Sequence, residues 1–375
     1  MNFLNIFKML LGEESLDKDF KNSTRLHCLD SLRGILSLLV VFHHYSLITS
    51  ENLDQLFLKN HKFLSEILNL FVFVGHISVW FFFILSGYSL SLFFSQKYEG
   101  NYFRYIVARL IRLYFPIEIA LLATFISMSF IPRNPLGLGE WVTGHPEKLE
   151  FRNFVKDFFI IFGSSANLSP LWSMQWEVLA SIFFPGIYFL SRRLSAKPFI
   201  IFTTCAVGLF GYIGIYAFVY FGMFLIGAIL QKIHKLQFKE SPFSILIMFV
   251  SFSLILFPYV YSTDNQYFYF IVIMILPLTG ITLCLNQIIR NRVVNYVLSI
   301  KLFRNFGKIS FSLYLTHETV LLAFTYYFRG DSFYNLFALG LVFPVAIIFY
   351  LLIEKPSHQF ARKILISSRN LDAEN

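Results

Sequence analysis

The sequence predicts an all-α membrane protein: a bundle of about ten transmembrane helices with the N- and C-termini in the cytoplasm. Only 14% of its 375 residues are charged, whereas 56% are hydrophobic. A water-soluble domain carries about 25% charged residues, so much of this surface is expected to face lipid. The other two observations are a series of apolar runs of membrane-spanning length and the uneven distribution of lysine and arginine between those runs.

Ten apolar runs are long enough to cross a bilayer as helices of about 17 to 25 residues. They are predicted at residues 34–50, 67–95, 113–131, 171–190, 198–213, 215–230, 243–260, 267–289, 309–327 and 333–353. Only a tight turn in the stretch FGYIGIYAF separates the fifth run from the sixth. The stretch FVKDFFIIFG is too short and too charged to cross.

The basic residues predict the orientation, because lysine and arginine concentrate in the cytoplasmic loops of membrane proteins. With the N-terminus inside, the inner segments hold 24 of the 31 basic residues and the outer segments hold seven. This split supports ten spans with both ends inside. The basic residues also lie in short clusters along the whole chain, which excludes a nucleic-acid-binding groove.

The predicted organisation is a cytoplasmic N-terminal segment (1–28), a transmembrane domain (29–356) and a cytoplasmic tail (357–375). The N-terminus lacks a signal with a small-residue cleavage site, so we expect the first span to target a multi-pass protein to the cell inner (cytoplasmic) membrane. The longest outer segment, about residues 132–170, is expected to form a small cap. Three cysteines lie far apart without metal-ligand spacing, so packing roles are expected for them and no metal site is predicted.

Several titratable side chains fall inside the predicted spans. Because each costs a few kcal/mol in a bilayer, each is a functional hypothesis by default. They are His43, His44, His76, Glu177, His317 and Glu318, with Arg33, Arg109 and Arg112 at the inner boundary.

Depth estimates select among these groups. His44 lies eleven positions after Arg33, which places it roughly 16 Å above the arginine, near the middle of a roughly 30 Å core. Glu177 lies roughly 10 Å below the outer surface, and His317 about 12 Å from the inner one. We therefore expect a cavity near the midplane that contains these three side chains. Neighbours on a helix are about 100° apart, so at most one of His317 and Glu318 is expected to line it.

Six motifs occur in the order seen in the multispanning acyltransferase type 3 family, which the chain resembles from about Leu29 to Pro356. They are LDSLRGILSLLVVFHH, FFFILSGYSLS, RLIRLYFP, LWSMQWEVLASIFFP, ISFSLYLTHETVL and IEKP. Members of this family are bacterial membrane enzymes that O-acylate lipopolysaccharide O-antigens, other polysaccharides, nodulation factors and some antibiotics. The resemblance implies the same class of activity here.

The resemblance also implies roles for individual residues. The family spacing of an arginine, ten residues and a histidine fits Arg33 and His44, so it implies a catalytic His44 and leaves His43 as its neighbour. The paired arginines match Arg109 and Arg112, which the resemblance links to the acyl-coenzyme A donor. The other matches are Ser86, Gly87, Trp172, Ser173 and Glu177, while Ser31 and His76 depart from the family pattern.

Acyl transfer from a thioester to a hydroxyl needs a base, stabilisation of the developing oxyanion and a grip on the anionic donor. His44 is the natural base, and Glu177 can orient its imidazole if the two touch. Arg109 and Arg112 can clamp coenzyme A phosphates, with Arg33 binding the donor or supporting the site. Residues that can line the substrate cavity are Ser86, Trp172, Ser173 and His317.

The leading prediction is an O-acyltransferase that moves an acyl group, expected to be acetyl from acetyl-CoA, to a hydroxyl of a cell-surface polysaccharide, O-antigen or lipid-linked glycan. The main alternative is a transporter or flippase for a polar or glycan substrate, and a third is a scaffold in polysaccharide assembly. The absence of an internal repeat argues against transporter folds built from duplicated halves.

Several of these residues also have a purely structural interpretation. Arg33 can simply pair with Asp30, the paired arginines can act only as topology determinants, and Ser86 can be a small packing residue beside Gly87. Ser86 is not predicted to be a nucleophile, because nothing in the sequence sets a base next to it. The sequence leaves open whether transfer is direct or passes through an acyl-enzyme.

Overall fold

The computed structural model describes residues 27–52, 61–96, 98, 101–160, 165–193, 196–234, 242–261 and 266–371. These residues form helices joined by turns and contain no β-strand, so the all-α prediction is confirmed for the described part of the chain. The helices are α3 (His27–Asn52), α5 (Lys62–Gln96), α6 (Tyr102–Phe130), α7 (Glu140–Thr143), α8 (Phe151–Phe158), α9 (Leu171–Arg193), α10 (Ala196–Ile213), α11 (Tyr216–Ile233), α12 (Ser244–Val260), α13 (Gln266–Arg290), α14 (Arg292–Leu298), α15 (Lys301–Tyr327), α16 (Ser332–Phe349), the π-helix η2 (Tyr350–Glu354) and α17 (Lys355–Leu371).

A helix covers most of each of the ten ranges predicted to span the membrane. Five helical stretches of the described residues are long and apolar enough to cross a bilayer: His27–Ser50, Lys62–Gln96, Tyr216–Ile233, Val272–Arg290 and Ser332–Leu365. A multi-pass membrane protein is therefore supported, while the count of ten spans and the orientation stay predictions. Most of the predicted tail is helix α17.

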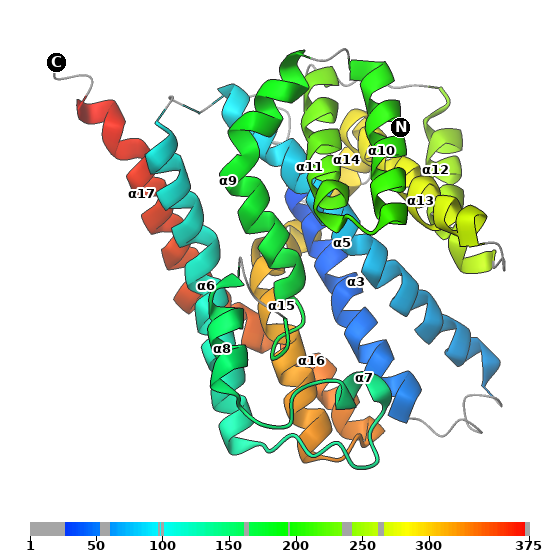
Figure 1. Cartoon of the computed structure of the whole chain (residues 1–375), viewed down its shortest axis with the longest axis vertical. Helices are drawn as coiled ribbons and strands as arrows, with labels where there is room; N and C mark the ends of the chain where they lie inside the picture. Colours follow the sequence, from blue (N-terminus) through cyan, green and yellow to red (C-terminus); the bar gives the residue numbers. More distant parts are fainter. Residues whose placement is uncertain are drawn as a thin grey trace, which may run out of the picture.

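The centre of the bundle is formed by α3, α5, α11 and α15 (Figure 1). Helix α3 packs against both α5 and α15, and α5 packs against α11. Helix α17 runs beside α6 along one flank, whereas α10, α12 and α13 gather on the opposite flank. This arrangement places the first predicted span in the interior, which explains why that helix can carry polar side chains away from lipid.

The predicted outer cap contains the two short helices α7 and α8. Helix α7 contacts α3, and α8 contacts α6. Both lie at the same end of the bundle as the turn between α15 and α16 (Figure 1). The segment between α6 and α9 thus covers one end of the central helices.

Two glycines allow α5 and α11 to approach each other closely. A Cβ atom on Gly227 would lie 2.0 Å from the backbone oxygen of Ile84, and one on Gly87 would lie 2.1 Å from the backbone oxygen of Phe224. Small residues at such crossings let helix backbones pack in direct contact. Of the two residues in the SG motif, Gly87 is therefore the packing residue.

Replacing Gly227 with alanine is expected to destabilise the protein by about 1 to 3 kcal/mol, because the backbones must separate to admit the methyl group. Gly340 of α16 is a matched control, since a Cβ there would meet nothing within 4 Å. Thermal unfolding in detergent should show a lower Tm for Gly227→Ala and an unchanged or higher Tm for Gly340→Ala. Equal Tm values for the two variants would contradict the close crossing.

The cysteines differ in their environment. Cys28 and Cys284 are buried, as expected of packing residues, whereas Cys205 is exposed. Among the described residues, no group of three or more His, Cys, Asp and Glu side chains is arranged to hold a metal ion.

Candidate functional site

His44 of α3 lies in the interior and contacts a second histidine. Its residue exposure is 8%, and its Nδ1 lies 2.8 Å from Nε2 of His317 on α15. His317 is fully buried, and its own Nδ1 lies 3.1 Å from the backbone oxygen of Leu313, one turn earlier. The close packing of α3 on α15 therefore joins two imidazoles and a carbonyl in one line.

The carbonyl at the end of this line determines where the protons lie. A carbonyl oxygen only accepts hydrogen bonds, so Nδ1 of His317 donates and, in the neutral ring, Nε2 is left with a lone pair. That lone pair accepts from Nδ1 of His44, so the remaining nitrogen of His44, Nε2, also carries a lone pair. Its position makes Nε2 of His44 the proton acceptor of the site.

Glu318 is the carboxylate beside this acceptor. Its Oε2 lies 3.9 Å from Nε2 of His44, and its side chain is fully buried. The other oxygen, Oε1, accepts a hydrogen bond of 2.8 Å from the backbone N–H of Ser169. The Ser169 hydroxyl donates to Oε2 and lies 3.4 Å from Nε2 of His44. The prediction that at most one of His317 and Glu318 lines the site is wrong, because both approach His44.

His145, which follows α7, contacts Glu318 from the cap. Its Nε2 lies 3.3 Å from Oε1 of Glu318, and its Nδ1 lies 3.0 Å from the backbone oxygen of Trp141. Glu318 therefore has a partner on the cap in addition to Ser169, which precedes α9.

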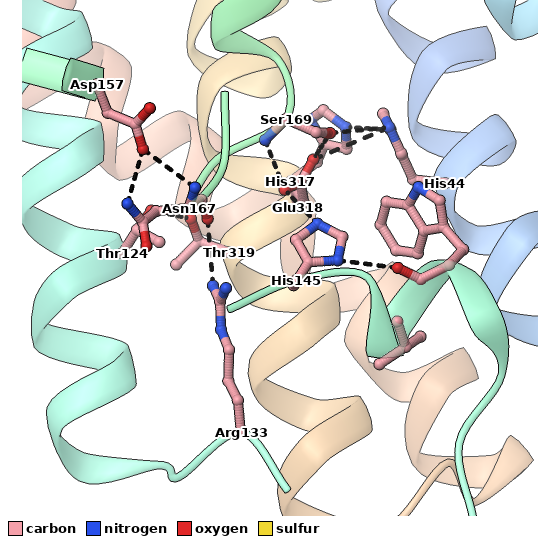
Figure 2. A network of polar contacts seen from close by, with 12 residues as sticks. His44, Thr124, Arg133, His145, Asp157, Asn167, Ser169, His317, Glu318 and Thr319 are labelled. Carbon is pink, nitrogen blue, oxygen red and sulfur yellow. Dashed lines mark hydrogen bonds and ion pairs between the residues drawn. The ribbon is translucent and has the colours of Figure 1, made fainter. Parts of the chain in front are cut away.

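A second set of contacts holds the segment that carries Ser169 (Figure 2). The backbone N–H and the side-chain amide of Asn167 donate to Oδ2 of Asp157, at 3.0 and 2.7 Å. Arg133 donates to the backbone oxygen of Asn167 at 3.3 Å. Asn167 and Asp157 are each 1% exposed. Ser169, at the turn that leads into α9, is thus fixed by buried polar contacts two residues upstream.

Aromatic rings from the cap cover the His44 imidazole. The ring centroid of Trp141 on α7 lies 5.2 Å from that of His44, and the ring of His145 lies 4.7 Å from that of Trp141. The hydroxyl of Tyr326 on α15 donates to the backbone oxygen of Val142 and ties α7 down. The cap therefore forms one wall of the site.

The structure gives Glu177 different partners from those predicted. Its Oε1 accepts a hydrogen bond of 2.6 Å from Arg109 on α6 and one of 2.5 Å from the hydroxyl of Ser86 on α5. Arg109 also donates to the hydroxyl of Ser181 at 3.0 Å. The carboxylate that contacts His44 is Glu318, so the expected pairing of His44 with Glu177 is replaced. Ser86 has a carboxylate beside it that the sequence did not reveal.

The two arginines of the RLIRLYFP motif point to different helices. Arg109 reaches α9 through Glu177, whereas the exposed Arg112 donates from Nε to Nε2 of His358 on α17 at 3.3 Å. His358 lies 3.7 Å from Oε1 of Glu354. Both arginines thus have partners on neighbouring helices, and their joint clamp on coenzyme A stays a prediction.

The remaining predicted residues lie around the same helices. Arg33 pairs with Asp30 at 3.1 Å and donates to the hydroxyl of Ser89 at 2.6 Å. The hydroxyls of Ser173 and Tyr314 lie 2.6 Å apart. The ring of Trp172 stacks at 6.5 Å on that of His76. These contacts tie α3, α9 and α15 to the central helix α5 or to one another.

His43 differs from His44 in its contacts. Its Nδ1 lies 2.7 Å from the backbone oxygen of Val72 on α5, to which it donates. Its ring lies edge-on to that of His44, with centroids 4.8 Å apart. His43 thus joins α3 to α5, whereas His44 faces the site.

Sequence reasoning missed Ser169 and His145 as site residues. Both lie in the segment between α6 and α9, where no helical periodicity allows a depth or a face to be calculated. The available signal was the cluster of polar side chains in a segment expected to form a cap. Glu318 was flagged for its depth, but its partners depend on tertiary packing.

A buried imidazole with a proton-accepting nitrogen, oriented by a second imidazole and placed next to a carboxylate, is an arrangement suited to general base catalysis. Its location in an all-helical bundle with membrane-length helices defines the class: a membrane protein equipped for proton transfer. A family model described as an acyltransferase domain matches residues 26–354, and the chain belongs to this family, the acyltransferase type 3 family. No curated protein and no solved structure matches the chain significantly.

Proposed function

We propose that this acyltransferase is a multi-pass enzyme of the inner membrane. It transfers an acyl group, expected to be acetyl, from acyl-CoA to a hydroxyl of a cell-surface polysaccharide, an O-antigen of lipopolysaccharide or a lipid-linked glycan. The observation that carries the proposal is the pairing of His44 with His317, which leaves Nε2 of His44 as a proton acceptor next to Glu318.

This geometry supports a general-base mechanism. His44 removes the proton of the acceptor hydroxyl as its oxygen attacks the acyl carbonyl, and the imidazole becomes positively charged. The carboxylate of Glu318, 3.9 Å from the receiving nitrogen, stabilises that charge. The hydrogen bond to His317 keeps the ring in the correct tautomer.

The donor end of the site is assigned to the arginines on the predicted cytoplasmic side. Arg112 binds a phosphate of coenzyme A in this proposal, which its exposure and its forked guanidinium support. Arg109 forms an ion pair with Glu177, so its contribution is to hold α6 against α9. Because acyl-CoA is made in the cytosol and the acceptor is a surface glycan, the acyl group crosses the membrane during transfer.

A comparison of the surface glycans of cells with and without the gene tests this function. Mass spectrometry should show the loss of one acyl mass per modified sugar, 42 Da being about the value for acetyl, when the gene is deleted. Purified protein in lipid vesicles should release many equivalents of coenzyme A per enzyme from acetyl-CoA only when the glycan is present as acceptor. If deletion of the gene leaves the glycan mass unchanged, and the purified protein moves the glycan across vesicle membranes, the flippase is favoured instead.

A further inference from the structure

Ser169 lies in the site, although none of the six family motifs contains it. Its hydroxyl oxygen lies 3.4 Å from Nε2 of His44, the nitrogen that carries a lone pair. A serine hydroxyl next to a histidine that is itself oriented by a third group is the arrangement of an activated nucleophile, and such contacts are often longer without substrate. Here the third group is His317, at 2.8 Å from the far nitrogen of His44.

The surroundings hold Ser169 in place for this role. Its backbone N–H donates to Glu318 at 2.8 Å, and its hydroxyl donates to the second oxygen of the same carboxylate. Upstream, Arg133 and Asp157 fix Asn167 by three hydrogen bonds to its backbone and amide. Rotation about the Cβ–Oγ bond can turn the hydroxyl proton from Glu318 to His44 while the oxygen stays in position.

We propose that Ser169 is a catalytic nucleophile that carries the acyl group as an ester between donor and acceptor. The inference rests on the proposed function, because it takes the donor to be an acyl thioester and the acceptor to be a hydroxyl. It answers a question that the sequence left open, namely whether the acyl group is bound covalently to the enzyme.

In the first half-reaction, Oγ of Ser169 attacks the thioester carbonyl and its proton passes to Nε2 of His44. The carbon–sulfur bond breaks, and the thiolate of coenzyme A takes the proton from His44. In the second half-reaction, the acceptor hydroxyl gives its proton to His44 while its oxygen attacks the Ser169 ester. The carbon–Oγ bond breaks, and Oγ regains the proton. The sum is a thioester plus an alcohol giving an ester plus a thiol.

The position of Ser169 gives the covalent step a physical advantage. Ser169 lies two positions before the first residue of α9, at the end of that helix predicted to face outward, whereas the donor is expected to approach from the inner side. With an acyl-enzyme, coenzyme A and the glycan need not occupy the buried site together. Each substrate reaches the same serine in turn from its own side.

The test uses the full-length protein in lipid vesicles with radiolabelled acetyl-CoA and no acceptor, quenched in acid. We expect a burst of coenzyme A equal to about one equivalent per enzyme. Mass spectrometry should find the acetyl group on the peptide that contains Ser169, and added glycan should remove it. Ser169→Ala should abolish the label and lower transfer by about 10³-fold.

Two variants keep the test decisive. Ser169→Cys should retain a label as a hydroxylamine-sensitive thioester, which shows that the site still folds. Ser129→Ala, which changes an exposed serine at the same end of the bundle, should label like the wild type. Transfer by Ser169→Ala at the wild-type rate, or a label on another residue, would overturn the covalent role and leave the transferase function intact. Neither label nor transfer by the wild type with its host's glycan would overturn both.

Discussion

Replacing His44 with asparagine is expected to lower the rate of acyl transfer by about 10³-fold, which corresponds to about 4 kcal/mol of lost transition-state stabilisation. The asparagine amide can still donate a hydrogen bond where Nδ1 of His44 donates to His317, so the contact between α3 and α15 is kept. No group at the position of Nε2 remains to accept the hydroxyl proton. The measurement is kcat for transfer by the purified variant in vesicles, with Tm recorded in parallel.

The matched control is His43→Asn, one residue earlier on the same helix. Its amide can replace the hydrogen bond that Nδ1 of His43 donates to Val72. Because this ring joins α3 to α5 through Val72, transfer should fall by no more than about tenfold. Equal losses for the two variants would refute the assignment of the base to His44 and would indicate a shared structural role.

Replacing Glu318 with glutamine is expected to lower transfer by about 10² to 10³-fold with little change in stability. Two unit charges about 4 Å apart interact by about 4 kcal/mol at an effective dielectric constant of about 20, and the variant loses this support for the protonated His44. With its carbonyl oxygen at the Oε1 position, the glutamine can still accept from the backbone N–H of Ser169 and contact His145, and its NH2 group at the Oε2 position can donate to the Ser169 hydroxyl oxygen, so the local contacts survive. Measurements of kcat and Tm on the same variant distinguish the loss of the Glu318 charge from a loss of packing.

Glu177→Gln distinguishes between the two candidate carboxylates. Glu177 forms an ion pair with Arg109 at 2.6 Å, so this variant should lower Tm by disrupting the contact between α6 and α9. Its effect on kcat should be smaller than that of Glu318→Gln. If Glu177→Gln lowers transfer as much as Glu318→Gln does, at unchanged Tm, then Glu177 and not Glu318 is the carboxylate that supports His44.

Much of the helical framework could be predicted, because a helix in lipid must satisfy its backbone internally and therefore needs a long apolar run. A helix covers most of each run identified in the sequence. The burial of His44 could also be predicted, since depth along a helix follows from the rise of 1.5 Å per residue. The identity of its partners could not be predicted in the same way. His317 was expected near His44 on grounds of depth, but Glu177 was expected there on the same grounds and lies instead against Arg109 and Ser86.

The sequence by itself determined that this is an all-α membrane protein of the acyltransferase type 3 family and that a histidine lies deep in its first apolar helix. Only the tertiary structure decided that Glu318 and Ser169, and through Glu318 also His145, make up the surroundings of that histidine. The physical reason is that depth is a local property of one helix, whereas contacts depend on the rotation of each helix about its axis and on neighbours far away in the chain. The segment that carries Ser169 and His145 has no period from which either could be read, and its position is set by buried contacts such as that between Asp157 and Asn167.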